Sequence, residues 1–296
     1  MVMVGLPIIE NLIAGLLMGS FYALMAVGLT LIFGVMRIVN FAHGELYMLG
    51  GYILYYLATL FGLNNFIALP IVIGIMFIVG VVIEKTLLRP IIVEKLGDEY
   101  SIIITFGLSL FLVNFAIAFF GPEYKSPPPY VQAYRVQLGP ISISGDRLLV
   151  ASIAVVILVI AYLIISKTRV GLAMRAAAQN REGAMLCGID IYKVNMFTMG
   201  LASALAGAAG ALLSTIMLLY PQAGLIPAIK SYVIIALGGM GSLIGAVVGS
   251  VILGIVESLG TVLLSAAYRD AYSFLVLILV LLLRPQGLFG VRVREV

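Results

Sequence analysis

Long stretches of uncharged, apolar residues recur along most of the 296-residue chain. A helix that spans a membrane needs roughly 20 such residues, within a usual range of about 17–25. Runs that meet this requirement lie at 11–36, 46–68, 66–83, 101–120, 148–165 and 194–219. The runs are continuously apolar rather than alternating, so they predict helices and not the strands of a membrane barrel. We therefore expect an all-α, polytopic membrane protein.

The composition supports the same fold class. Hydrophobic residues make up 63% of the chain and charged residues only 10%, whereas a soluble domain has about 25% charged residues. This excludes a soluble enzyme, a nucleic-acid-binding protein and a disordered scaffold. The single cysteine, Cys187, excludes an internal disulfide, and the single histidine, His43, excludes a histidine-rich metal site. The first basic residue is Arg37, so we expect the chain to begin with a mature spanning segment rather than a cleavable signal peptide.

The C-terminal third departs from simple spanning helices. The run 231–256 is long enough to span but is interrupted by Gly238-Gly-Met-Gly-Ser242. The run Ala271–Leu283 has only 13 residues, so it spans only if charged flanking residues such as Arg269 and Arg284 extend outward from it. The sequence thus predicts about eight spanning segments, at least one of them broken or re-entrant, within a single transmembrane domain over residues 1–296.

The distribution of Lys and Arg predicts the orientation, because cytoplasmic loops carry an excess of these residues. Twelve of the 17 fall in one alternate set of connections: Arg37, Lys85, Arg89, Lys95, Lys167, Arg169, Arg175, Arg181, Lys193, Arg284, Arg292 and Arg294. The other five are Lys125, Arg135, Arg147, Lys230 and Arg269. The bias places the N-terminus and the proline-rich loop 121–147 outside. It also requires segment 231–263 to enter and return as a bent pair.

The segment from Gly34 to Glu45 places Arg37, Asn40, His43 and Glu45 between two apolar runs. Irregular backbone at membrane depth occurs only inside protein or beside water. One interpretation is a broken helix whose polar groups line or gate a translocation path. Another is an ordinary cytoplasmic loop with its polar residues in water, and a third is a proton relay between the histidine and the glutamate. The residues alone do not decide among these.

The long basic loop 167–193 has a helix-forming centre, Ala176-Ala-Ala178. Read as one helix, it places Arg175, Gln179 and Glu182 on one face, opposite the small residues Ala173, Ala177, Ala184 and Gly188. A small-residue face suits close docking into a groove of a partner. The alternative is a solvated basic loop that only enforces the topology.

The glycine-rich break at 238–245 is followed by Gly249, Gly254 and Glu257. Small residues at this density allow close helix crossings. A bolder interpretation pairs this break with the one at 34–51, because paired interrupted segments mark transport sites near the membrane midplane. Glu257 is isolated within apolar sequence, which makes it a candidate for the path. It could instead be a polar contact between helices.

Several of these stretches together resemble one known family. Residues 28–45 (GLTLIFGVMRIVNFAHGE) are similar to the permease subunits of bacterial and archaeal ABC importers for branched-chain amino acids, of the LivH type. Residues 237–246 (LGGMGSLIGA) and 282–290 (LLRPQGLFG) resemble the C-terminal part of that family. The inner loop resembles the family's ATPase-contacting loop through Gly171, Arg175, Ala176, Ala177, Asn180, Ala184 and Gly188. The resemblance covers essentially the whole chain.

The resemblance implies a permease subunit that pairs with a second, related permease in the cytoplasmic membrane of a bacterium or archaeon. Two cytoplasmic ATPase subunits would drive transport, and an extracytoplasmic binding protein would deliver leucine, isoleucine or valine. No G-x-x-x-x-G-K-[ST] motif occurs here, so ATP would be bound by the partners, and we expect this chain to be no enzyme and to hold no cofactor. Asn40, His43, Glu45 and Glu257 are assigned to the path or its gate.

Three alternatives stay open at this stage. Related permeases carry urea or short amides, and the quoted motifs do not exclude those substrates. A stand-alone secondary transporter would use His43, Glu45 and Glu257 as an ion relay, but such carriers usually hold several intramembrane ionisable groups. A passive channel would use the same residues only to line a pore.

Overall fold

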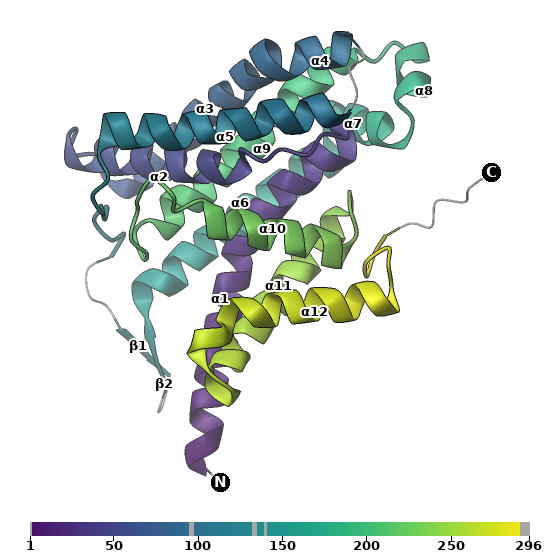
Figure 1. Cartoon of the computed structure of the whole chain (residues 1–296). Helices are drawn as coiled ribbons and strands as arrows, with labels where there is room; N and C mark the ends of the chain where they lie inside the picture. The colour runs from purple at the N-terminus through teal and green to yellow at the C-terminus, as the bar shows by residue number, and fades with distance from the viewer. Residues whose placement is uncertain (1, 95–97, 132–134, 139–140, 291–296) are drawn as a thin grey trace.

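The computed structural model of the chain describes residues 2–94, 98–131, 135–138 and 141–290. Within these residues the structure is almost entirely helical, as predicted (Figure 1). The first half contains α1 (Val2–Leu31), α2 (His43–Thr59), α3 (Asn65–Ile83), α4 (Arg89–Val93), α5 (Asp98–Phe120) and α6 (Gly145–Lys167). The second half contains α7 (Arg169–Gln179), α8 (Arg181–Leu186), α9 (Ile191–Leu213), α10 (Leu225–Gly238), α11 (Leu243–Leu263) and α12 (Arg269–Leu283).

Helix α1 is the centre of the packing, because it contacts α6, α9, α10 and α11. Glycines explain how the helices approach so closely. A Cβ atom added at Gly15 of α1 would lie 2.7 Å from the carbonyl oxygen of Gly254 in α11, nearer than a side chain tolerates. Helices α2 and α9 meet in the same way at Gly50 and Gly207. Small residues at helix crossings are typical of packing in lipid.

Seven helices are long and apolar enough to cross a membrane among the residues described. They are Ile8–Met36, Asn65–Val93, Glu99–Phe120, Gly145–Lys167, Ile191–Leu213, Leu243–Leu263 and Ala266–Leu283. The last of these, Ala266–Leu283, has 18 residues. The short run predicted at 271–283 is therefore lengthened by the residues that precede it. Helix α10, with 14 residues, is a shorter apolar helix. Its length of about 21 Å is less than the roughly 30 Å of a bilayer core.

One predicted run needs correction. Residues 46–68 do not form a continuous span, because α2 ends at Thr59 and α3 begins at Asn65. Gly62 turns the chain with a φ of 62°, and the side chain of Asn64 caps α3 by accepting a hydrogen bond from the Phe66 N–H at 3.0 Å. The stretch is uncharged, so a search for charged interruptions does not find the turn, although Gly62 and Asn64 mark it. Helix α2, with 17 residues, falls at the lower limit for a span.

The break predicted at 238–242 is confirmed. Helix α10 ends at Gly238 and α11 begins at Leu243, with Gly239 and Gly241 at φ values of 101° and 84° between them. Such angles favour glycine, which has no Cβ to clash with the backbone. The C-terminal segment docks here, because the Leu288 N–H donates to the Leu237 carbonyl at 2.8 Å.

The proline-rich segment that opens the predicted outer loop has an irregular backbone over its described part. Residues 121–131 contain no helix, and β1 (Arg135–Leu138) pairs with β2 (Ile141–Ser144) as an antiparallel hairpin. Residues Lys125 and Leu219 pair through their backbones, which brings two predicted outer connections together. Lys230, counted above with the outer loops, instead lies within α10 and is only 6% exposed.

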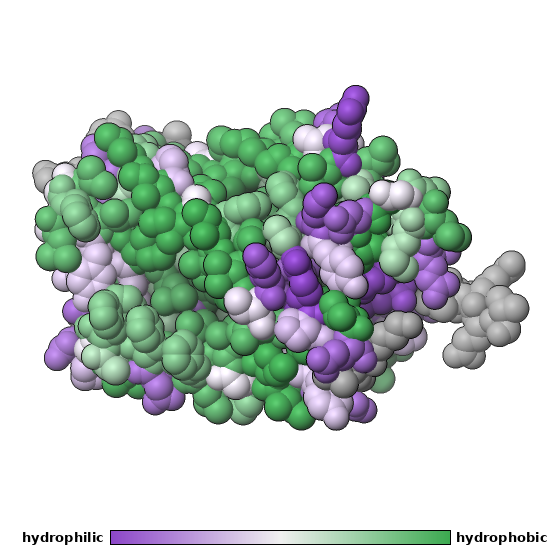
Figure 2. All heavy atoms as spheres, turned by 90° about the horizontal axis from the view of Figure 1, so that it is seen from above, coloured by the Kyte–Doolittle hydropathy of each residue, from purple (hydrophilic) through white to green (hydrophobic). Residues whose placement is uncertain are grey.

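The predicted cytoplasmic connections gather at the opposite end. Residues around Arg37, in α4 and in α8 line one common cavity there. Viewed from above, hydrophobic side chains cover most of the visible face, while hydrophilic ones concentrate to the right, the side on which α7 and α8 lie in Figure 1 (Figure 2). Lys95, Arg292 and Arg294, which also belong to the predicted cytoplasmic set, lie outside the described residues.

Candidate functional site

The first candidate site is the break between α1 and α2. Helix α1 continues into a π-helical turn, Ile32–Met36, which ends at Arg37. Arg37 has a φ of 57°, the only positive value at a non-glycine residue in the described chain. Residues 38–42 are not helical, and α2 begins at His43. Both π-helical turns and left-handed non-glycine residues are frequent at functional positions.

The structure separates the four polar residues of this break by their burial. Asn40 and His43 are 0% exposed and Glu45 is 7% exposed, whereas Arg37 is exposed. The interpretation of an ordinary loop in water is therefore wrong for Asn40, His43 and Glu45, which are enclosed by protein. Arg37 is exposed, and whether it lies in the cytoplasm stays a prediction.

Several hydrogen bonds hold the break to neighbouring helices. The Tyr232 hydroxyl of α10 donates to the Asn40 carbonyl at 2.7 Å, and the Thr105 hydroxyl of α5 donates to the Val39 carbonyl at 3.1 Å. His43 Nε2 lies 3.0 Å from the Met25 carbonyl oxygen. Because a carbonyl only accepts, Nε2 carries the proton and Nδ1 is an acceptor. The irregular backbone is thus fixed rather than loose.

The side chains of the break also have unused hydrogen-bonding atoms. Asn40 Oδ1 accepts from the Ala42 N–H at 3.1 Å, and Ser109 of α5 hydrogen-bonds to the Glu45 carboxylate. Asn40 Nδ2, His43 Nδ1 and Glu45 Oε2 have no partner within the described structure. An unsatisfied buried polar atom costs about 1–3 kcal/mol. One donor and two acceptors are therefore available here to water or to a polar ligand.

The second candidate site surrounds Glu257 of α11, which is fully buried. Its carboxylate accepts hydrogen bonds from the Tyr22 hydroxyl at 2.9 Å, from Lys230 at 2.9 Å and from the Ser273 hydroxyl. Arg269 Nε lies 3.3 Å away. Lys230 also pairs with Asp270 at 3.0 Å. These side chains join α1, α10, α11 and α12. We call them the Glu257 cluster, which consists of Tyr22, Lys230, Glu257, Arg269, Asp270 and Ser273.

The Glu257 cluster has balanced charge, with two cationic and two anionic side chains, and its central carboxylate is fully hydrogen-bonded. Buried charges persist in a membrane only when paired in this way. Sequence reasoning found Glu257 but missed its partners. The available signal was Lys230, the one charged residue within the apolar segment 225–238. Whether Glu257 borders the path stays a prediction.

The third candidate site is the cytoplasmic loop, which the structure divides into two helices. Asn180 has an extended backbone and caps α8 by accepting from the Gly183 N–H at 2.9 Å. The single helix assumed from the sequence is therefore wrong, and Arg175 and Glu182 do not share one helical face. An asparagine whose side chain competes for backbone hydrogens favours such a boundary.

Two of the four residues of the expected small-residue docking face pack inside this chain, while Ala173 is half-buried and Gly188 is exposed. Ala177 and Ala184 are buried in the protein's own core. The Arg175 guanidinium donates to the Ile165 carbonyl at the end of α6, and Gly171 closely approaches the same segment. Ala176 is half-buried, and Asn180 and Gly188 are exposed. The exposed apolar residues of the loop are instead Val170, Leu172, Met185 and Leu186.

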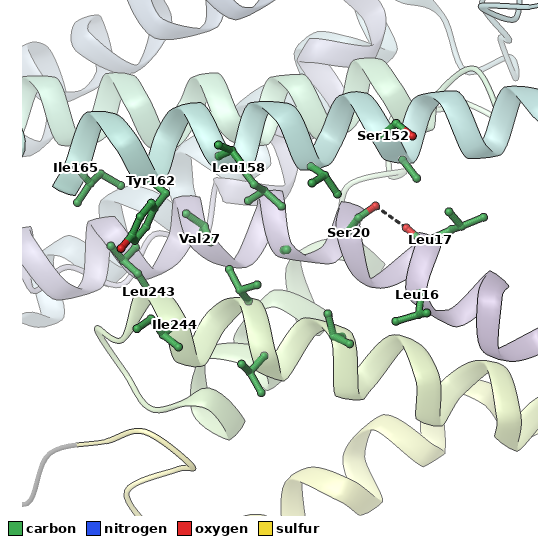
Figure 3. A pocket seen from close by; sticks show the side chains of 17 residues that line it. Leu16, Leu17, Ser20, Val27, Ser152, Leu158, Tyr162, Ile165, Leu243 and Ile244 are labelled. Carbon is green, nitrogen blue, oxygen red and sulfur yellow. Dashed lines mark hydrogen bonds between the residues drawn. The ribbon is translucent and has the colours of Figure 1, made fainter. Parts of the chain in front are cut away.

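An apolar groove of about 640 Å³ runs along α1 between α6 and α11. Figure 3 shows Leu158 and Tyr162 of α6 on one side and Leu243 and Ile244 of α11 on the other. The Ser20 hydroxyl is already bonded to the Leu17 carbonyl at 2.7 Å, and Ser152 is bonded to Leu148. Among the described residues that line the groove, both serine hydroxyls are thus already bonded and the Tyr162 hydroxyl is the main polar group left, so the chemistry of the groove is mostly that of a lipid-facing surface.

The comparisons with known proteins agree across the chain. A profile of the family described as "Branched-chain amino acid transport system / permease component" matches residues 11–282. The high-affinity branched-chain amino acid transport system permease protein BraD of Pseudomonas aeruginosa is 31% identical over 95% of both chains. The corresponding permease protein LivH of Escherichia coli K12 is 30% identical, again over 95% of both chains. No solved structure matches the chain significantly.

Proposed function

The chain belongs to the family of permease components of branched-chain amino acid transport systems, and from this premise we propose that it translocates leucine, isoleucine and valine across the cytoplasmic membrane. In this proposal the chain is one permease subunit of an ABC importer. A second permease completes the path, two ATPase subunits supply the driving force, and an extracytoplasmic protein delivers the substrate. ATP is bound by the partners only.

The observation that carries the proposal is the match to named amino acid permeases over nearly the full length of both chains. The break at residues 37–45 supports it independently. A zwitterionic substrate needs both donors and acceptors, and Asn40, His43 and Glu45 offer unused atoms of both kinds. We propose that these three residues line or gate the path, and that Tyr232 couples them to the broken pair α10–α11.

The test is uptake by the reconstituted system. The permease pair, the ATPase and the binding protein in liposomes are expected to accumulate radiolabelled leucine only when ATP is supplied. Excess isoleucine and valine should compete with leucine, whereas urea and acetamide should not. If the amides compete and the branched-chain amino acids do not, the substrate proposal is wrong and the permease carries short amides instead.

The same liposomes separate the importer from its rivals. A secondary transporter or a channel would move leucine through the permeases without the ATPase. Flux under those conditions, with or without an ion gradient, would overturn the ABC mechanism. We expect no flux, because movement of α10 and α11 has to be driven from outside the membrane.

We further propose that the loop 167–193 transmits that movement. Leu172, Met185 and Leu186 are exposed on it, outside the candidate spans, where apolar side chains gain by docking. Leu186 is 91% exposed. The expected contact is apolar and lies on the opposite side of α7 and α8 from the buried Ala177 and Ala184.

Substitution of the exposed residue tests this contact. Leu186→Asp is expected to abolish co-purification of the ATPase and substrate-stimulated ATP hydrolysis, because a charge would be buried without a partner. Leu60→Asp, at the exposed turn between α2 and α3, is the matched control and should change neither. If both variants retain the ATPase, the contact lies elsewhere.

The proposed orientation has a direct test as well. In a variant with Cys187 replaced, a cysteine at Asn180 should react only with a reagent that reaches the cytoplasm, and one at Ser144 should react from outside. External labelling at position 180 in intact cells would overturn the orientation and the coupling proposal together.

A further inference from the structure

A cleft of about 840 Å³ opens at the predicted cytoplasmic end of the molecule. Its walls come from the α1–α2 break, from α4, from the start of α5, from α8 and from the start of α9. The cleft therefore joins the break to the cytoplasmic loop. It is separate from the apolar groove along α1.

The position of the cleft relative to the membrane follows from the candidate spans. Three of them begin or end at lining residues, at Met36, Val93 and Ile191, and a fourth begins at Glu99, two residues before the lining residue Ser101. These four residues come from different parts of the chain, and three of them flank or line the same cavity. The cleft therefore lies at the depth where apolar core gives way to phospholipid headgroups.

Two guanidinium groups line the cleft, those of Arg37 and Arg181. Because both side chains line the same cavity, two like charges face it, and partial burial together with the charge of Arg37 lowers the pKa of Arg181. Neither arginine forms an ion pair with a residue whose side chain the structure describes. Paired guanidinium groups without a counter-ion favour a bound anion that offers several oxygen acceptors.

The two carboxylates that line the cleft do not supply that anion. Asp190 is committed to the start of α9, where it accepts from the Tyr192 and Lys193 N–H groups and pairs with Lys193 at 3.4 Å. Glu182 is exposed and adjacent in sequence to Arg181. Its charge opposes an incoming anion, so its removal should strengthen binding.

The remaining walls are mostly apolar, and their polar members are Ser101 and Tyr192. Ile38 and Ile91 are buried, while Val93 and Met185 are exposed at the edge. A ligand for this cleft thus combines an anionic group with a hydrocarbon portion. Basic pockets between membrane helices on the cytoplasmic side bind phospholipid headgroups. We propose that the cleft binds an anionic phospholipid of the inner leaflet, with its phosphate between Arg37 and Arg181 and its first methylene groups against Val93 and Met185.

A bound lipid would link two moving parts. Arg181 belongs to the loop proposed to contact the ATPase, and Arg37 directly follows the π-helical turn before Asn40. A phosphate held by both would stabilise their present arrangement. The proposal rests on the predicted orientation and does not depend on which substrate is carried.

The experiment measures lipid retention by the assembled importer. The complex is purified from nanodiscs that contain phosphatidylglycerol and phosphatidylcholine in equal amounts, and the retained lipids are quantified by mass spectrometry. The wild-type complex is expected to enrich phosphatidylglycerol, and Arg37→Gln with Arg181→Gln to lower its retention about tenfold, since charge-assisted hydrogen bonds are lost. Lys167→Gln, an exposed basic residue that does not line the cleft, should retain it.

Glu182→Gln removes a negative charge next to Arg181, whereas the arginine variants remove positive charges. It should therefore raise phosphatidylglycerol retention. Three results would overturn the proposal. Retention could be equal in the wild type and the double arginine variant. Soluble glycerol 3-phosphate could displace the lipid at millimolar concentration, which would indicate a free-anion site. The arginine variants could lose the ATPase while lipid retention stays unchanged, which would indicate a protein contact.

Discussion

The break at residues 37–45 and the Glu257 cluster are both buried polar regions in a membrane protein, but their hydrogen bonding differs. In the Glu257 cluster the carboxylate has four donors from α1, α10 and α12. In the break, Asn40, His43 and Glu45 each hold a polar atom without a partner in the described structure. The first region is satisfied by the fold itself, and the second keeps polar atoms that water or a ligand could satisfy.

The difference suggests different roles for two regions that look alike in sequence. Lys230 and Glu257 fasten the short helix α10 to α11, and Asp270 extends the contact to α12. The break is fastened through its backbone, by Tyr232 and Thr105, which leaves its side chains available. We expect substitutions in the cluster to change stability and substitutions in the break to change transport.

The largest expected effect is at the centre of the cluster. Glu257→Leu leaves Lys230 with one anionic partner and removes the acceptor for Tyr22 and Ser273. Breaking a buried ion pair in this way costs about 3–5 kcal/mol. Thermal denaturation of the detergent-solubilised complex should show a large fall in the melting temperature. A change no larger than that of a surface substitution would mean that the cluster is not structural.

A double variant sharpens the same point. Glu257→Leu combined with Lys230→Met removes both buried charges and leaves Arg269 and Asp270 at the edge of the cluster. The loss should be smaller than the sum of the two single losses, with a coupling free energy of about 0.5–3 kcal/mol. A double-mutant cycle on the melting free energies measures it. Strict additivity would show that the two side chains do not act as a pair.

Glu45→Gln tests the other side of the comparison. The glutamine side chain can still accept a hydrogen bond from Ser109, so the unfolding free energy should change by less than about 1 kcal/mol. Leucine uptake should fall about tenfold, because a charge-assisted contact to the substrate ammonium group is lost. Glu123→Gln, at an exposed outer position, is the control. Normal uptake by the Glu45→Gln, His43→Ala and Asn40→Ala variants alike would remove the break from the mechanism.

The smallest effect is expected at Asp190, an exposed polar contact that serves as reference for the two buried regions. Hydrogen bonds from the Lys193 and Tyr192 N–H groups lower the pKa of Asp190, so its stabilisation is present above the ordinary aspartate pKa of about 3.9. It is lost as the pH falls through the lower pKa of the folded state. Asp190→Ala should lower the melting temperature slightly at pH 7, and its effect should shrink as the pH falls below the ordinary aspartate pKa. Asp190→Asn, which keeps a capping oxygen but not the charge, should lie between the wild type and Asp190→Ala at pH 7.

Much of the fold was predictable because membrane burial imposes its pattern on every spanning helix. Uncharged runs marked the spans, and the glycines at 238–242 marked the bend between α10 and α11. The turn at 60–64 was missed because the stretch is uncharged, although Gly62 and the capping residue Asn64 were available as signals. The division of the cytoplasmic loop at Asn180 was missed because helix propensity alone does not reveal a side chain that caps the next helix.

The candidate site residues, too, were predictable only in part from the sequence. The sequence by itself determined that Asn40, His43, Glu45 and Glu257 lie among apolar residues, which is informative because polar groups are costly there. Only the tertiary structure decided that Glu257 meets Lys230 and Tyr22, and that Ala177 and Ala184 face inward. Those contacts join residues up to 235 positions apart. They depend on which helix faces pack together, and no local pattern along the chain encodes that choice.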